Sequence, residues 1–94
     1  MFEYDHSLLS LVELQRKGIR STKMLEEAIE GYSFADATYF ERLGYEVVVF
    51  TGFSRHSQAV KVACRIKREK LVILDATIPT VEEVVRDFCR YAKL

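Results

Sequence analysis

Apolar residues of the β-branched and aromatic kinds are concentrated in residues 45–76, and their spacing predicts three short strands in succession. The run from Val47 to Phe50 suits a pleated, mostly buried strand. The strands are expected at 45–51, 58–67 and 71–76. Because the segments between them are short, we expect an antiparallel meander.

The middle segment, 57–67, fits two periodicities. As a strand it places four apolar residues on one side, namely Val60, Val62, Cys64 and Ile66. As a helix it would leave Val60 exposed, so the strict alternation favours the strand. The helix alternative would give the chain an order of strands and helices similar to that of a receiver domain, with Asp75 as the phosphorylated residue. A receiver domain also needs an earlier strand that ends in acidic residues, and this sequence has no such strand.

Helical spacing of apolar residues predicts two helices before the strands and one after them. The first two end near Gly18 and Gly31, which suit the last positions of a helix. The last helix begins with the capping-box spacing of Thr80 and Glu83. Its apolar stripe consists of Val81, Val84, Val85, Phe88 and Ala92. We expect this stripe to pack on the sheet face formed by Val60, Val62, Cys64 and Ile66.

Two segments have weaker patterns. Residues 32–43 hold several aromatic residues without a clean period, and a third helix or a turn is favoured there over a short strand. Residues 1–4 are expected to form a short edge strand. The predicted fold class is therefore α+β, with two N-terminal helices, a three-stranded antiparallel meander and a C-terminal helix (about 80–92) packed on one sheet face. All of this belongs to a single domain, residues 1–94.

The amino-acid composition indicates the broad class to which the protein belongs. The 94 residues are 49 % hydrophobic and 30 % charged with zero net charge, a balance typical of soluble globular domains. Cys64 and Cys89 are too few for a disulfide framework or a zinc site. The apolar run near Leu8 is too short for a signal peptide or a membrane span. We expect a cytoplasmic protein without metal, cofactor or membrane contact.

The zero net charge conceals a basic segment, because residues 55–70 hold six Lys or Arg and one acid. Three of these cations would project from one face of the second strand, namely Lys61, Arg65 and Lys67. Arg55 and His56 would lie in the turn at one end of that strand. Such cations can position phosphate groups, and a histidine exchanges its proton near neutral pH. The alternative is an ordinary solvated face with an inert turn histidine.

The order of these segments resembles the BrnT-like branch of the RelE superfamily, the small ribonuclease toxins of toxin–antitoxin pairs. The matching segments are FEYD (2–5), RKGI (16–19), LEEAIEG (25–31), YEVVVFTG (45–52), QAVKVACRI (58–66), KLVILDAT (70–77) and VEEVVRDFCRY (81–91). Two positions depart from the family. Lys17 precedes Gly18 where the family has histidine, and the last strand runs into Asp75-Ala76-Thr77 without the family's arginine.

The resemblance implies an antiparallel sheet flanked by helices, metal-independent cleavage of RNA, and neutralisation by a cognate antitoxin protein. Under this hypothesis His56 and Glu46 are the candidate acid and base, and the phosphate-binding residues are Arg55, Lys61, Arg65 and Lys67. The two departures leave an inactive, degenerate member as an open outcome. The alternative function is a non-catalytic module for protein binding or dimerisation, including a homodimer.

Overall fold

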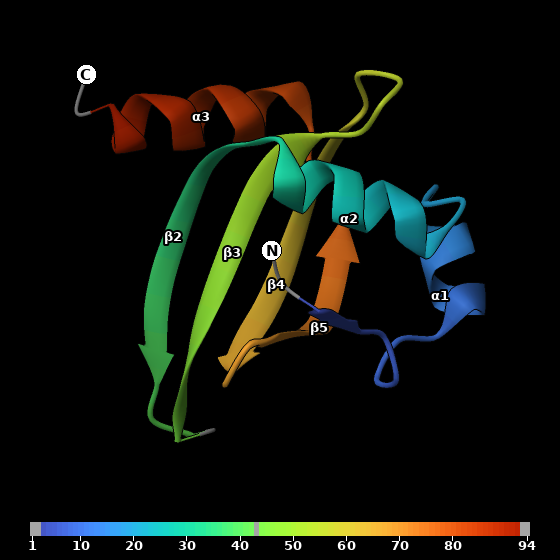
Figure 1. Ribbon diagram of the computed structural model, residues 1–94. Helices are drawn as coiled ribbons and strands as arrows, with labels where there is room; N and C mark the ends of the chain where they lie inside the picture. Colours follow the sequence, from blue (N-terminus) through green and yellow to red (C-terminus); the bar gives the residue numbers. More distant parts are fainter. Residues whose placement is uncertain (1–2, 43, 93–94) are drawn as a thin grey trace.

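The computed structural model describes residues 3–42 and 44–92, within which the chain forms five strands and three helices (Figure 1). In chain order these are β1 (Glu3–Asp5), α1 (Leu11–Arg16), α2 (Thr22–Glu30), β2 (Tyr32–Phe40), β3 (Tyr45–Phe53), β4 (Ala59–Lys67), β5 (Lys70–Thr77) and α3 (Val81–Tyr91). Residues 1 and 2 of the expected edge strand lie outside the described residues, as does Leu43 at the end of segment 32–43.

The strands of the described part form one mixed sheet in the order β1-β5-β4-β3-β2. Neighbours from β2 to β5 run antiparallel, whereas β1 runs parallel to β5 with Glu3 opposite Lys70. The predicted three-stranded meander is therefore wrong, because β3, β4 and β5 are the inner strands of a larger sheet. In β4 the buried residues Val60, Val62 and Cys64 alternate with half-buried ones, so the helix alternative and the receiver-domain hypothesis are also wrong.

Strand β2 is the element that the sequence pattern failed to predict. The helix or turn expected at 32–43 is wrong, since Tyr32–Phe40 pairs along β3. The pairing register shifts once, between Tyr32 and Phe34, and is continuous from Phe34 to Phe40. The pattern is weak because successive residues on one face of the strand mix apolar and polar side chains, as Phe34 and Asp36 do. The pairing with β3, rather than the periodicity of β2 itself, defines this edge strand.

The core lies on the face of the sheet that α2 covers (Figure 1). Its buried residues are Leu14, Ile19, Leu25, Ala28, Ile29, Phe50, Val60, Val62, Cys64, Leu71, Ile73 and Ala76. Helix α2 lies against the backbone of β3 at Gly52, where an added Cβ would lie 2.0 Å from the carbonyl oxygen of Ala28. A glycine is needed at position 52 because any side chain would push the helix away from the strand.

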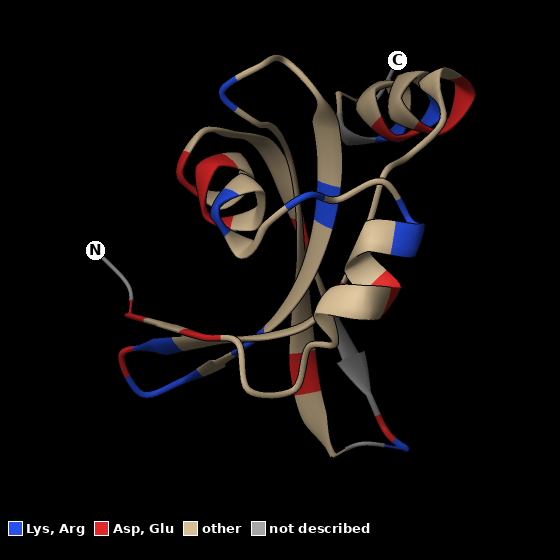
Figure 2. Ribbon diagram, turned by 90° about the vertical axis from the view of Figure 1, so that its right-hand side faces the viewer, with Lys and Arg blue, Asp and Glu red and all other residues tan. Residues whose placement is uncertain are grey.

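Helix α3 crosses the opposite face of the sheet, so α2 and α3 sandwich the strands (Figures 1 and 2). The predicted capping box is confirmed, since the Thr80 hydroxyl accepts the Glu83 N–H and the Glu83 carboxylate accepts the Thr80 N–H. The predicted packing of the apolar stripe is wrong. Val60, Val62 and Cys64 face α2, Ile66 is exposed, and α3 turns the polar Asp87 toward the sheet.

Candidate functional site

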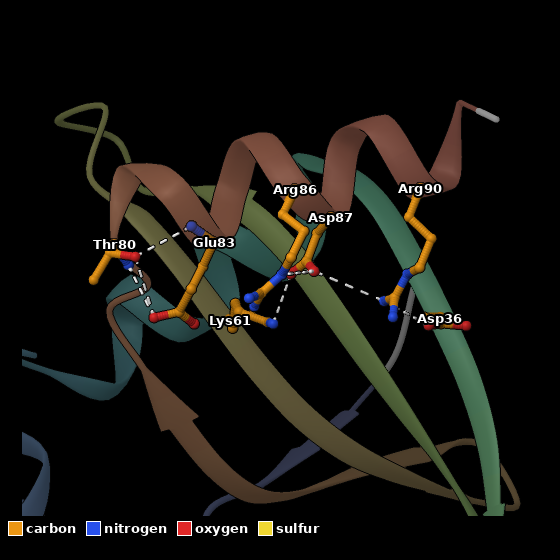
Figure 3. A network of polar contacts seen from close by, with 7 residues as sticks. All are labelled: Asp36, Lys61, Thr80, Glu83, Arg86, Asp87 and Arg90. Carbon is orange, nitrogen blue, oxygen red and sulfur yellow. Dashed lines mark hydrogen bonds and ion pairs between the residues drawn. The ribbon is translucent and has the colours of Figure 1, made fainter. Parts of the chain in front are cut away.

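A cleft of about 550 Å³ lies between α3 and the outer face of the sheet, the face away from α2. Its lining combines charged and apolar residues, namely Phe34, Asp36, Val49, Thr51, Lys61, Asp87 and Arg90. Figure 3 shows Asp87 and Arg90 pointing down from α3 toward Lys61 of β4 and Asp36 of β2. The cleft therefore brings together two cations and two acids from three elements.

The centre of this cleft is an ion pair between Lys61 and Asp87. The Lys61 Nζ donates a hydrogen bond of 2.8 Å to Asp87 Oδ2, and only 8 % of the Asp87 side chain is exposed. The hydrogen bond and charge of Lys61 hold the pKa of Asp87 below its usual value, although burial acts in the opposite direction. Lys61 was a predicted phosphate ligand, and this contact already neutralises its charge.

The remaining cation of the cleft is paired as well. Arg90 Nη2 lies 3.3 Å from Asp36 Oδ2 and 3.8 Å from Asp87 Oδ1 (Figure 3). Two acids offset two cations, so the net charge of the cleft gives an anion no advantage. We interpret this network as the set of contacts that holds α3 on a polar face of the sheet. A helix is more commonly held on a sheet by the packing of apolar side chains.

The other predicted cations of β4 lie away from this cleft. Arg65 stacks on the ring of Tyr45, with its guanidinium carbon 4.1 Å from the ring centroid. Lys67 lines a separate hollow at the β4–β5 turn, which also holds Lys70 and Arg68 but is balanced by the acids Glu3, Asp5 and Glu69. The stripe predicted from the sequence is thus divided between separate environments.

Arg55 and His56, in contrast, join two cations that sequence reasoning did not select. The turn after β3 lies beside the start of α2, and a small hollow of about 250 Å³ opens between them. We call this the basic hollow; it is lined by Arg20, Ser21, Lys23, Met24, Glu27, Arg55 and His56. A second hollow of about 250 Å³ adjoins it and shares Arg20, Met24 and His56. Figure 2 shows the basic residues on the α1–α2 loop and on the β3–β4 turn.

Local backbone geometry fixes this arrangement. The β3–β4 turn is closed by hydrogen bonds between Ser54 and Gln58, and Ser57 adopts a left-handed φ of 64°. The Arg55 N–H donates to Glu27 Oε1 at 3.1 Å, which ties the turn to α2. Among the described residues that line the hollow, one acid, Glu27, stands against three cations. The lining therefore has a net positive charge.

The start of α2 strengthens that positive charge. A helix carries partial positive charge at its N-terminus, and acids in the first turn usually compensate it. The first turn of α2 contains no acid and holds Lys23 instead, and the Ser21 side chain makes no capping hydrogen bond among the described residues. The helix terminus, Lys23 and Arg20 thus add to one potential that favours a bound anion.

Glu46, the predicted base, lies at the other end of β3. It is exposed, and its position differs from that of Phe53 by seven residues, or roughly 23 Å along an extended strand at about 3.3 Å per residue. The structure therefore brings Arg55 and His56 together but separates them from Glu46, Lys61, Arg65 and Lys67. The sequence did hold a signal that could have identified Arg20 and Lys23. They flank the predicted start of a helix whose first turn contains no acidic residue, and such a start favours an anion.

Comparison with family models, curated proteins and solved structures found no match to this chain. Within residues 3–42 and 44–92, no helix is long and apolar enough to cross a membrane. In the same ranges, no three His, Cys, Asp or Glu side chains are grouped so as to hold a metal ion.

Proposed function

We propose that the protein binds RNA at the basic hollow and that His56 takes part there in metal-independent cleavage of the phosphodiester. The observation that carries the proposal is the convergence of Arg20 and Lys23 with Arg55 and His56 from two distant segments of the chain. Cations around a helix N-terminus form a site for phosphate. The choice of RNA among phosphate-bearing ligands follows from the resemblance of the sequence to ribonuclease toxins.

The chemistry requires a proton acceptor, a proton donor and positive charge. In such a reaction the ribose 2′-hydroxyl attacks the neighbouring phosphorus, the bond to the 5′-oxygen breaks, and a cyclic phosphate and a free 5′-hydroxyl result. A base removes the 2′ proton and an acid protonates the leaving oxygen. Arg20 and Arg55 are placed to stabilise the added negative charge on the phosphate.

Two residues in the basic hollow can move protons, His56 and Glu27. The distance along β3 removes Glu46 from this role, and Glu27 takes its place as the second proton-transfer group. His56 remains the candidate acid or base that the sequence suggested. Lys61 and Arg65 are assigned structural contacts, with Asp87 and Tyr45 respectively.

The proposal is tested by measuring RNA binding and RNA cleavage separately. With a labelled single-stranded oligonucleotide, Arg20→Ala combined with Arg55→Ala should weaken binding about tenfold and lower the salt dependence by about 1.4 in log–log slope, the loss expected for two phosphate contacts. His56→Gln should leave binding within about threefold but slow cleavage by about 100-fold or more.

The matched control removes two cations elsewhere. Lys67→Ala combined with Arg68→Ala changes the net charge equally at the β4–β5 turn and should leave both activities nearly unchanged. Binding without cleavage by the wild-type protein would support the non-catalytic alternative over the nuclease. Equal losses of binding in the two double variants would contradict the assignment of the site to the basic hollow.

A further inference from the structure

The second hollow beside the basic hollow, which we call the adjoining hollow, differs from it in chemistry. Its lining consists of Gly18, Arg20, Met24, Ser54, His56 and Gln58. Among these described residues none is acidic, and a thioether, a hydroxyl and a carboxamide accompany the two basic side chains. Because Arg20, Met24 and His56 also line the basic hollow, the two hollows lie side by side.

Part of this lining suits a flat, uncharged ring. Met24 packs against the core, and its Sδ accepts the Arg20 N–H at 3.3 Å, which holds the thioether beside the α1–α2 loop. Arg20 and His56 add a planar guanidinium and a planar imidazole. Unpaired nucleobases stack on planar side chains of these kinds, so the adjoining hollow offers the surfaces that a base requires.

The β3–β4 turn supplies hydrogen-bonding groups that the fold itself leaves free. Gln58 Nε2 donates to the Ala59 carbonyl oxygen at 3.2 Å, which orients the side-chain amide, and Gln58 Oε1 accepts no hydrogen bond from the described residues. Ser54 Oγ accepts the Gln58 N–H at 3.2 Å and keeps its own proton to donate. One free acceptor and one free donor in the same lining can bind polar atoms at the edge of a base.

We propose that the adjoining hollow binds the nucleobase on the 5′ side of the phosphate held in the basic hollow, an inference that rests on the proposed function. A nucleotide joins a charged phosphate to an uncharged polar ring through its ribose, and the two hollows divide in the same way. His56 lines both, so it lies where the ribose 2′-hydroxyl would be. Because Gln58 contributes an acceptor, a base with an amino group, such as cytosine, is favoured over uracil, which has a carbonyl there.

Oligonucleotides with 2′-fluoro ribose test this inference by fluorescence anisotropy, because they lack the attacking hydroxyl and are not cleaved. The wild-type protein should bind a cytidine strand about fivefold more tightly than a uridine strand, the effect of one hydrogen bond. It should bind the cytidine strand at least about tenfold more tightly than an abasic strand with the same backbone, the effect of base stacking.

Gln58→Leu should reduce the preference for cytidine to about twofold or less and leave binding of the abasic strand unchanged. Gln15→Leu is the matched control, because Gln15 is the other glutamine of the chain, is exposed on α1 and is absent from the described lining of both hollows. It should keep the full preference. Both variants change exposed side chains, so their melting temperatures should match that of the wild type.

The abasic strand separates a failure of this inference from a failure of the proposed function, because it keeps every phosphate. Equal binding of all three strands by the wild-type protein would overturn the base site while the phosphate site stands. A preference for uridine, or an equal loss of preference in Gln15→Leu and Gln58→Leu, would overturn the role of Gln58. No binding of any strand would overturn the proposed function and the base site together.

Discussion

The pair formed by Lys61 and Asp87 decides how α3 lies on the protein. Lysine on the outer face of a strand resembles an ordinary solvated cation in the sequence, and aspartate within an amphipathic helix resembles an ordinary polar residue. In the structure the two meet at 2.8 Å with Asp87 nearly buried. A charge removed from water is tolerated only when it is paired, so each residue requires the other.

Substitution of one partner should therefore cost more than substitution of both. Lys61→Met removes the hydrogen-bonded partner of buried Asp87 and leaves it only the more distant guanidinium groups of Arg86 and Arg90, 3.9 and 3.8 Å away. It should lower the free energy of unfolding by about 2–3 kcal/mol, as measured by urea denaturation. Lys61→Met combined with Asp87→Leu should return stability to within about 1 kcal/mol of the wild type. Arg16→Met is the matched control, since its pair with Glu13 is exposed, and it should change stability by about 0.5 kcal/mol or less.

The same pair predicts an effect of pH. The pKa of Asp87 is lower in the folded protein than in the unfolded chain, where aspartate has a pKa of about 3.9. Its contribution to stability is therefore complete above pH of about 4 and is lost as the pH falls through the lower folded pKa. The Lys61→Met/Asp87→Leu variant should lose less stability than the wild type between neutral and acidic pH. Equal losses would contradict a role for this carboxylate.

At the scale of elements, the contact between α2 and β3 depends on a single glycine. Gly52→Ala would place a Cβ 2.0 Å from the Ala28 carbonyl oxygen, and backbone atoms cannot move aside as a flexible side chain can. We expect a loss of more than about 3 kcal/mol of unfolding free energy, or no folding at all. Gly31→Ala is the control, because its nearest atom would lie at 3.4 Å, and it should change stability by less than about 1 kcal/mol.

The elements were predictable where one side of a segment is buried and the other is not. The alternation of β4 identified that strand, and the Thr80 and Glu83 spacing identified the start of α3. Strand β2 was not predictable in this way, because Phe34 and Asp36 share one face of the strand and the sequence therefore lacks a regular alternation of apolar and polar residues. The sequence also could not predict that the apolar side of α3 faces away from the sheet. Periodicity shows that a helix has an apolar side, but it does not show what that side contacts.

At the scale of the whole molecule, the sheet separates two surfaces with different chemistry. The basic hollow lies beside α2 on one side, and the apolar stripe of α3 lies on the other. The proposed RNA site therefore involves none of the exposed apolar residues of α3.

The sequence predicted only part of the candidate site. Arg55 and His56 were identified because they follow a strand end in a basic segment. Arg20 and Lys23 precede them by 32 to 36 residues, and only the packing of α2 beside β3 brings them together. Conversely, Lys61 was predicted as a free cation because its partner Asp87 comes from the last helix.

The most direct test of the account is to locate RNA on the protein by nuclear magnetic resonance. A ¹⁵N-labelled sample is titrated with a short single-stranded RNA, and the backbone amide shifts are followed. The account predicts that the largest changes fall on residues 20–24 and 54–58, the two segments that contribute residues to the basic hollow and to the hollow that adjoins it. Absence of any change, or changes confined to Tyr45, Arg65 and the β4–β5 turn, would contradict it.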